Sequence, residues 1–291
     1  MKKIIALCLI FIMSITFLSS TMAYADTVKL SKTKLTLNEG ESYTLKLTGT
    51  TKTVKWSTSN KEIATVSSKG VVKAVKAGTA TITATVSSKK YTCKVTVKEV
   101  FNAKKAVQNL SSTTYNGSKG VINIVKNNYN FPMHLEATIV YYDSDNLMIG
   151  KSTADNYYFE KGKECVLFFY APTDLDYNYV PYDHYKITYS ARSTEYMKSN
   201  LKDIKVTSNI GIDNVMLEVV NDGDESAEYT QIYILFYKDG EIVGVDYRYA
   251  DVDEPGSVDY IEFSFPYDEN YDTIDIDDYA IYVNSSYRYD W

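Results

Sequence analysis

Residues 77–85 read Ala-Gly-Thr-Ala-Thr-Ile-Thr-Ala-Thr, and this stretch decides the fold of the first third of the chain. Small apolar residues alternate with threonine, which is the period-2 pattern of a strand with one face in a core and the other toward solvent. The same alternation recurs nearby, for example at Leu35 and Leu37. Turn signals separate the runs, and we interpret Gly70 and Gly78 as turn glycines that adopt a positive φ. The pattern predicts a small β-sandwich of about seven short strands.

The order of motifs in this segment resembles a known family. The motifs are Lys55-Trp56-Ser57-Thr58-Ser59-Asn60, Ile63-Ala64-Thr65-Val66, Gly70-Val71-Val72, Ala77-Gly78-Thr79-Ala80-Thr81-Ile82-Thr83 and Val95-Thr96-Val97. Over about residues 28–98 they resemble a bacterial immunoglobulin-like domain of group 2. The resemblance implies a surface-exposed, non-enzymatic spacer or adhesion module, in which Trp56 is the core anchor and not a ligand platform.

The first 25 residues predict a secretory signal peptide. Lys2 and Lys3 precede an apolar run, and Ala23-Tyr24-Ala25 supplies the small residues of a cleavage site after Ala25. The alternative, a retained membrane anchor, is disfavoured because the run is short for a span of about 20 residues. We therefore expect a secreted or cell-surface protein with no membrane span after cleavage, and the C-terminal sequence shows no recognisable covalent anchor.

Charge divides the chain into three parts. Residues 26–98 carry a net charge of +10 from 14 lysines and four acids, residues 99–199 carry −1, and residues 200–291 carry −17. With the signal peptide at 1–25, we place domains at 26–98, 104–195 and 200–291. The lysines of the first domain, among them Lys73, Lys76, Lys89 and Lys90, either form a solvated face or attract an anionic cell-wall polymer. Nucleic acid is excluded as a partner because arginine is absent from this segment and stacking aromatics are few.

The remainder of the chain is a tandem repeat. A shift of 94 residues aligns Phe169 with Phe263, and a one-residue insertion in a hairpin explains the only slip. Each copy alternates as a β-domain, so the fold class is all-β throughout, with tandem Ig-like or β-sandwich domains after the cleaved signal peptide. The copies resemble FxLYD-type extracellular β-sandwich domains, which implies another non-catalytic surface module.

Two features of the repeats are candidate sites. Tyr233, Tyr247 and Tyr249 replace polar residues of the first copy, and Tyr237 aligns with Tyr142. These four tyrosines are either exposed, where they suit a surface glycan or protein, or cover the edge between the copies.

The motif Pro-x-Asp-x-x-Tyr recurs at Asp174 and Tyr177 and at Asp268 and Tyr271. We interpret it as architecture, with the aspartate capping a turn and the tyrosine hydroxyl bonded to the backbone.

No catalytic constellation is apparent, and we expect no cofactor and no metal. The acidic cluster at 222–225 offers oxygen ligands for calcium but lacks the loop pattern of a calcium site. Cys93 and Cys165 lie in different domains and are predicted to be buried thiols. The sequence predicts a non-enzymatic exported protein of the cell surface or cell wall with an adhesion, interaction or spacer role. The alternative is a secreted carbohydrate-binding protein that uses the tyrosines of the second repeat.

Overall fold

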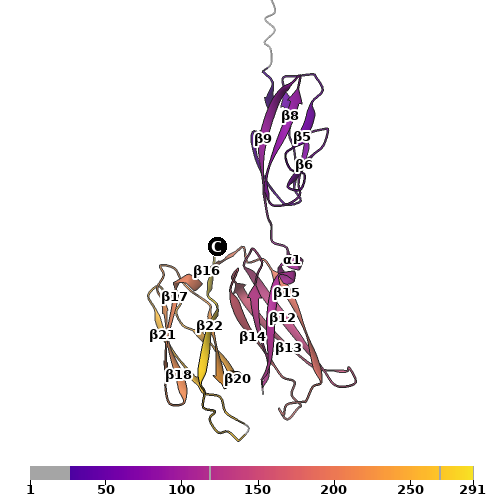
Figure 1. Ribbon diagram of the computed structural model, residues 1–291. Coiled ribbons are helices and arrows are strands. Elements are labelled where there is room, and N and C mark those ends of the chain that lie inside the picture. Colours follow the sequence, from indigo (N-terminus) through magenta and orange to yellow (C-terminus); the bar gives the residue numbers. More distant parts are fainter. Residues whose placement is uncertain (1–26, 118, 269, 291) are drawn as a thin grey trace, which may run out of the picture. The chain divides into compact units, whose positions relative to one another are not determined.

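The computed structural model describes residues 27–117, 119–268 and 270–290, and this part of the chain is nearly all β (Figure 1). The chain divides into two compact units between Val100 and Phe101. Unit 1 holds the lysine-rich segment, and unit 2 holds both repeats. The predicted signal peptide and its cleavage site after Ala25 lie outside the described residues.

Unit 1 is a β-sandwich. One sheet has the order β2-β9-β8-β5, the other β3-β7-β6, and β1 pairs with β4. Strand β2 runs parallel to β9, and the other neighbours are antiparallel. The strands are β1 (Lys29–Leu30), β2 (Lys34–Asn38), β3 (Ser42–Thr44), β4 (Leu47–Thr48), β5 (Lys55–Thr58), β6 (Ala64–Val66), β7 (Val71–Ala74), β8 (Gly78–Val86) and β9 (Lys89–Lys98).

The alternation in β8 works as its sequence indicates. Ala80, Ile82 and Ala84 are buried in the core between the sheets, whereas the intervening threonines are more exposed. Cys93 of the paired strand is a buried free thiol in the same core. The sheet therefore has one apolar and one polar face, and most residues of the polar face are threonine or lysine.

Both predicted turn glycines have a positive φ, +80° at Gly70 and +145° at Gly78. At Gly70 an added Cβ would lie 2.4 Å from the carbonyl oxygen of Leu45 and 2.8 Å from an indole carbon of Trp56. Trp56 is half-buried and packs against the core, as the family resemblance implies. The Leu45 carbonyl and the Trp56 indole therefore lie so close to residue 70 that no side chain fits there.

Unit 2 contains two repeats of one sandwich topology. Sheets β10-β11-β14 and β13-β12-β15 form the first, and sheets β17-β18-β21 and β20-β19-β22 form the second. A short helix, α1 (Ala103–Gln108), precedes the first repeat, and a 3₁₀ turn, η1 (Leu201–Asp203), precedes the second. The strands are β10 (Leu110–Gly117), β11 (Gly120–Asn127), β12 (Met133–Tyr142), β13 (Met148–Phe159), β14 (Glu164–Tyr170), β15 (His184–Arg192), β16 (Met197–Ser199), β17 (Ile204–Ile210), β18 (Asn214–Asn221), β19 (Thr230–Lys238), β20 (Glu241–Ala250), β21 (Val258–Ser264), β22 (Asp278–Ser285) and β23 (Tyr287–Tyr289).

The repeats pack against each other through a second apolar cluster. Ile122 and Val166 of the first repeat meet Tyr233 and Leu235 of the second, and all four are buried. The two repeats keep separate cores but lie in one compact unit. The reason is that the sheet β20-β19-β22 has apolar residues on both faces, one toward its own core and one toward its neighbour.

A buried amide joins the repeats at the centre of this contact. The Asn284 side chain donates to the carbonyl oxygen of Val166 at 2.6 Å and accepts from its N–H at 2.8 Å. Strand β14 is at the edge of its sheet, so these two backbone groups have no strand neighbour on that side. Asn156 in turn donates to the backbone carbonyl of Asn284 at 2.6 Å. Asn284 thus completes the open edge of β14 in place of a further strand.

Candidate functional site

The four tyrosines predicted as one exposed row do not form one. Tyr233 is only 5% exposed, so its predicted exposure is wrong, whereas Tyr249 is 58% exposed. Tyr237 and Tyr247 are half-buried and pack against the same inter-repeat cluster as Tyr233. The alternative, that these side chains cover the edge between the copies, therefore describes three of the four. At the positions of Tyr233 and Tyr247 the first repeat has Thr138 and Thr153, on a sheet that does not contribute to this inter-repeat cluster.

Tyr249 instead lines a pocket where the two repeats meet. Its cavity volume is about 500 Å³, within the range of small-ligand sites. The aromatic residues that line it are Tyr157, Tyr229, Tyr249, Tyr287 and Tyr289. Tyr157 comes from the end of β13 in the first repeat and the others come from the second repeat, so both repeats contribute to the pocket.

The rings of this tyrosine pocket form two walls at nearly a right angle. Tyr229 stacks on Tyr287 with ring centroids 4.9 Å apart and planes 16° apart. Tyr289 is almost perpendicular to both, at 86° to Tyr229 and 87° to Tyr287. Tyr287 is buried and supports the wall, whereas Tyr229 remains 43% exposed. The pocket therefore offers aromatic faces to a ligand on a fixed base.

Two neutral polar groups complete the lining. Gln231 is 7% exposed and Ser285 is 4% exposed, and both contribute to the pocket surface. The Gln231 amide donates to the Tyr249 hydroxyl at 3.0 Å, and its oxygen accepts from Asn284 at 3.4 Å. This network orients the amide before any ligand binds, and the Tyr249 hydroxyl can then donate its own proton into the pocket.

One carboxylate, that of Asp155, lies near the tyrosine pocket. The negative charge of Asp155 raises the pKa of Tyr157, and its effect is larger than that of burial. The pKa of Tyr249 is raised by burial first, with smaller contributions from Tyr247 and Asp155. Burial likewise raises the pKa of Tyr287. These hydroxyls therefore stay protonated donors at neutral pH, and the nearby carboxylate disfavours an anionic ligand.

The sequence reasoning missed four of the five tyrosines of this pocket. A signal was present, because the strand register of the two repeats makes Gln231 and Tyr249 the equivalents of Glu136 and Asp155. A fold that forms equally well with acids at these positions does not need the aromatic side chain at residue 249. The sequence could not show that the five tyrosines come together in space, because Tyr157 and Tyr289 belong to different repeats.

A second candidate site is the outer face of the sheet β2-β9-β8-β5 in unit 1. No aspartate or glutamate occurs in these four strands. Lys34 lies directly opposite Lys94 in the strand register, a like-charge pairing that is unfavourable unless something else compensates. We name this surface the lysine–threonine face. Its outward residues are Lys34, Thr36, Lys55, Ser57, Thr79, Thr81, Thr83, Thr85, Lys90, Thr92, Lys94, Thr96 and Lys98.

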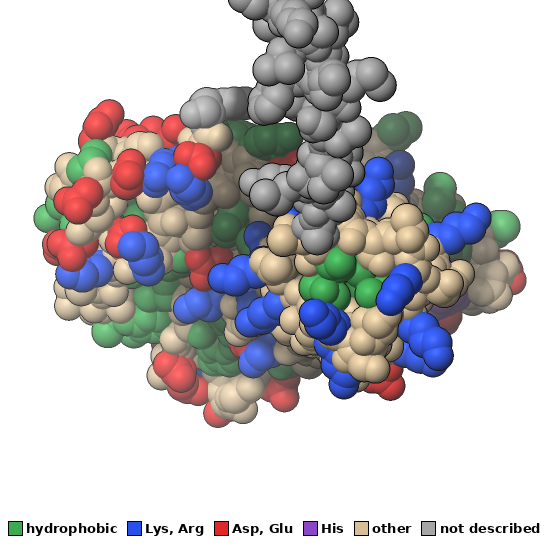
Figure 2. Space-filling view, turned by 90° about the horizontal axis from the view of Figure 1, so that it is seen from above, with side chains coloured by type: hydrophobic (Ala, Val, Ile, Leu, Met, Phe, Trp, Pro, Cys, Tyr) green, Lys and Arg blue, Asp and Glu red, His purple; other side chains and the backbone are tan. Residues whose placement is uncertain are grey.

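The structure does not gather the four lysines singled out in the sequence. Lys89 and Lys90 begin β9, whereas Lys73 is in β7 of the other sheet and Lys76 follows that strand. All four are exposed. Figure 2 shows lysine side chains distributed around the visible surface of unit 1. Of the four, Lys90 belongs to the lysine–threonine face, whereas Lys73 and Lys76 lie outside it.

The recurrent Pro-x-Asp-x-x-Tyr motif forms the same loop in both repeats. The Asp174 carboxylate accepts from the backbone N–H groups of Asp176 and Asn178, both at 2.9 Å, and these bonds lower its pKa, led by those from Asn178. Asp268 likewise caps its own turn, accepting from backbone N–H groups at 2.8 and 3.0 Å.

The tyrosine of this motif does not have the predicted role. Tyr177 and Tyr271 are 86% and 87% exposed, with a φ of 66° at both, so the expected bond from hydroxyl to backbone is wrong. The left-handed conformation directs the side chain away from the turn that the aspartate closes. The aspartate of the motif is thus structural, and its tyrosine is exposed to solvent.

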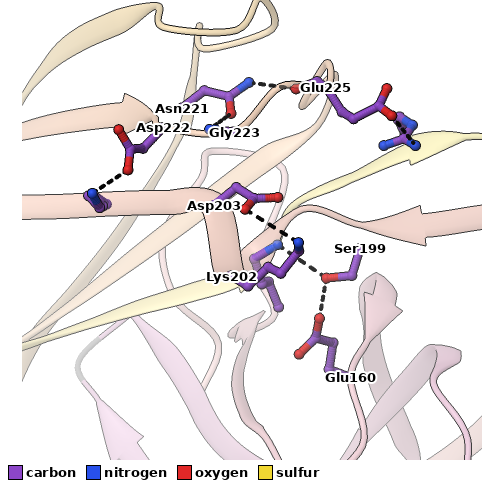
Figure 3. Close-up of polar contacts among 11 residues, drawn as sticks. Glu160, Ser199, Lys202, Asp203, Asn221, Asp222, Gly223 and Glu225 are labelled. Carbon is purple, nitrogen blue, oxygen red and sulfur yellow. Dashed lines mark hydrogen bonds and ion pairs between the residues drawn. The ribbon is translucent and has the colours of Figure 1, made fainter.

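The acidic cluster at 222–225 is held by ion pairs that point in different directions (Figure 3). Asp222 pairs with Lys205, whereas Glu225 lies 3.3 Å from Arg288. Asn221 is buried between them and donates to the backbone oxygen of Glu225 at 3.0 Å. Among the described residues, no group of three or more His, Cys, Asp or Glu side chains is arranged to hold a metal ion.

The fold of unit 1 is that of an Ig-like β-sandwich. More particularly, residues 24–98 match the family model of the bacterial Ig-like domain (group 2), which is about a quarter of the chain. The match confirms the family resemblance for this segment. The resemblance of the repeats to FxLYD-type domains stays a prediction.

Two known proteins are partly similar. A kappa-carrageenase of Pseudoalteromonas carrageenovora is 45% identical over 83 residues, 27% of this chain and 21% of that protein, so the chain spans about a fifth of its length. The crystal structure of Salmonella alpha-2-macroglobulin reacted with methylamine aligns with 83% of this chain over 22% of its own chain, at 8% sequence identity. The TM-score of 0.19 is too low to indicate a shared fold. None of the described helices has the length and hydropathy of a membrane-spanning segment.

Proposed function

We propose that this chain is an exported, non-catalytic protein of the cell surface or cell wall, and that unit 1 attaches it to anionic polymers. The observation that carries the proposal is the lysine–threonine face, where Lys34 and Lys94 are neighbours and the four strands contain no acid. A flat row of ammonium groups and hydroxyls suits a polymer that carries a charge on every unit. The partial similarity to a protein named for action on carrageenan supports a setting rich in polysaccharide.

The attraction is expected to be electrostatic and dependent on salt. A lysine near an anionic surface contributes about 1 kcal/mol, so three lysines contribute about 3 kcal/mol, or roughly a hundredfold in affinity. Raising the salt from about 0.1 M to about 1 M shortens the screening length from about 10 Å to about 3 Å and should abolish most of this gain.

The test compares two triple variants of the chain from Asp26 onward on immobilised poly(glycerol phosphate), with neutral dextran as the blank. The first combines Lys34→Gln, Lys94→Gln and Lys98→Gln on the lysine–threonine face. The control removes the same charge elsewhere in unit 1, with Lys61→Gln, Lys73→Gln and Lys76→Gln, all at exposed positions. We expect the first to lose roughly a hundredfold in affinity and the control less than tenfold. Equal losses, or binding that salt leaves unchanged, would contradict the proposal.

A further inference from the structure

We propose that the tyrosine pocket between the two repeats binds a neutral sugar unit of a glycan. This inference does not rest on the proposed function, because it concerns unit 2 and a ligand of different charge. It combines the pocket's shape, its neutral polar lining and the carboxylate of Asp155 near it. Each of these features restricts the ligand in a different way.

The shape of the pocket suits a ring with an apolar face. Tyr229 stacked on Tyr287 forms one wall, and Tyr289 at nearly a right angle forms the other. A pyranose presents its C–H groups on one side and its hydroxyls around the rim, so one face can lie on a tyrosine while the edge remains available for hydrogen bonds. A volume of about 500 Å³ admits one or two sugar rings.

The polar groups of the pocket match hydroxyls and not charges. Gln231 and Ser285 are buried neutral groups in the lining, and no lysine, arginine, aspartate or glutamate lines the cavity. The hydrogen bond from Gln231 to the Tyr249 hydroxyl fixes both groups in advance, which reduces the entropy lost when a ligand binds. The resulting array of donors and acceptors is the kind that orients a polyhydroxylated ligand.

The electrostatics exclude an anionic sugar. Asp155 is close enough to raise the pKa of both Tyr157 and Tyr249. A sulfated or carboxylated unit would be repelled at this pocket. A quaternary ammonium ion would be attracted by the tyrosine rings, but it would leave the buried amide and hydroxyl unused. The neutral sugar is the ligand class that uses every group present.

The experiment screens the chain from Asp26 onward on an array of neutral, sulfated and carboxylated glycans, then titrates the best neutral oligosaccharide by calorimetry. Tyr229→Ala and Tyr249→Ala truncate exposed walls and should each weaken binding at least roughly tenfold. The matched control is Tyr260→Ala, because Tyr260 is 67% exposed on β21 and does not line the pocket. Tyr249→Phe keeps the ring and removes only the hydroxyl, so we expect an intermediate loss.

Three results would overturn the inference. The first is that no neutral glycan binds. The second is that Tyr229→Ala and Tyr249→Ala bind as the parent does, or that Tyr260→Ala loses as much as they do. The third is that tetramethylammonium binds at this pocket while neutral glycans do not, which would identify a cation site. An unchanged Tm of unit 2 in Tyr249→Ala would show that the variant is folded, so that its loss of binding reports on the pocket.

Discussion

Replacing Asn284 with alanine should lower the free energy of unfolding of unit 2, because this one side chain bonds the free backbone groups of an edge strand. In the structure its amide satisfies both the N–H and the carbonyl of Val166, which is fully buried. Asn284→Ala leaves two buried backbone groups without a partner, at about 1–3 kcal/mol each. We therefore expect a loss of about 4 kcal/mol in the free energy of unfolding of unit 2. For a unit of this size that corresponds to a decrease in Tm of roughly 8–16 °C.

Differential scanning calorimetry of the chain from Asp26 onward measures this directly, because unit 1 provides an internal reference that should not move. The matched control is Asn209→Ala in β17, where the asparagine is exposed and should shift the Tm by less than about 2 °C. If the two variants unfold alike, the Asn284 contact contributes nothing and the argument from unpaired backbone groups is refuted.

Two further predictions concern the turn glycine and the buried tyrosines. Gly70→Ala should destabilise unit 1 by more than about 1 kcal/mol, because the new Cβ meets atoms at 2.4 and 2.8 Å, whereas Gly40→Ala, with a similar φ of +86° and nothing within 4 Å, should cost only the backbone strain; equal costs by urea denaturation would contradict this. Unit 2 should lose stability as the pH rises above about 10, since burial raises the pKa of Tyr141 and Tyr233 and the unfolded chain then releases protons that the folded chain retains. Tyrosinate absorbance that rises smoothly, with no cooperative unfolding step, would show that these tyrosines ionise in the folded state.

The strands could be predicted from sequence because their pattern depends only on local alternation. Ile82 and the threonines on either side of it show which face is buried without reference to any other part of the chain. The tandem repeat was equally accessible, because Phe169 and Phe263 occupy corresponding buried positions in the two copies. In each case the physical cause is contained within one strand or one fixed offset.

The contacts between the repeats could not be predicted in this way. Tyr233 replaces a polar residue of the first copy, and sequence alone cannot distinguish a tyrosine that faces solvent from one that faces a neighbouring domain. In the structure Tyr233 is buried in one cluster with Val166, and the strands that carry these two residues are far apart in the chain. The same limit explains why Tyr177 was assigned a structural hydrogen bond, since its positive φ, which directs it outward, leaves no signature in the residue itself.

The separation of charge along the chain gives the two candidate sites different ligands. The overall net charge of −6 suggests a mildly acidic protein, yet it is the sum of +10 in residues 26–98 and −17 in residues 200–291, with almost none between them. Because fields are screened within about 8 Å at physiological salt, which is less than the width of a domain, each site responds to its own surroundings and not to the sum. A polyanion therefore meets attraction at the lysine–threonine face and repulsion at the tyrosine pocket. The two proposals therefore assign ligands of different charge to unit 1 and unit 2.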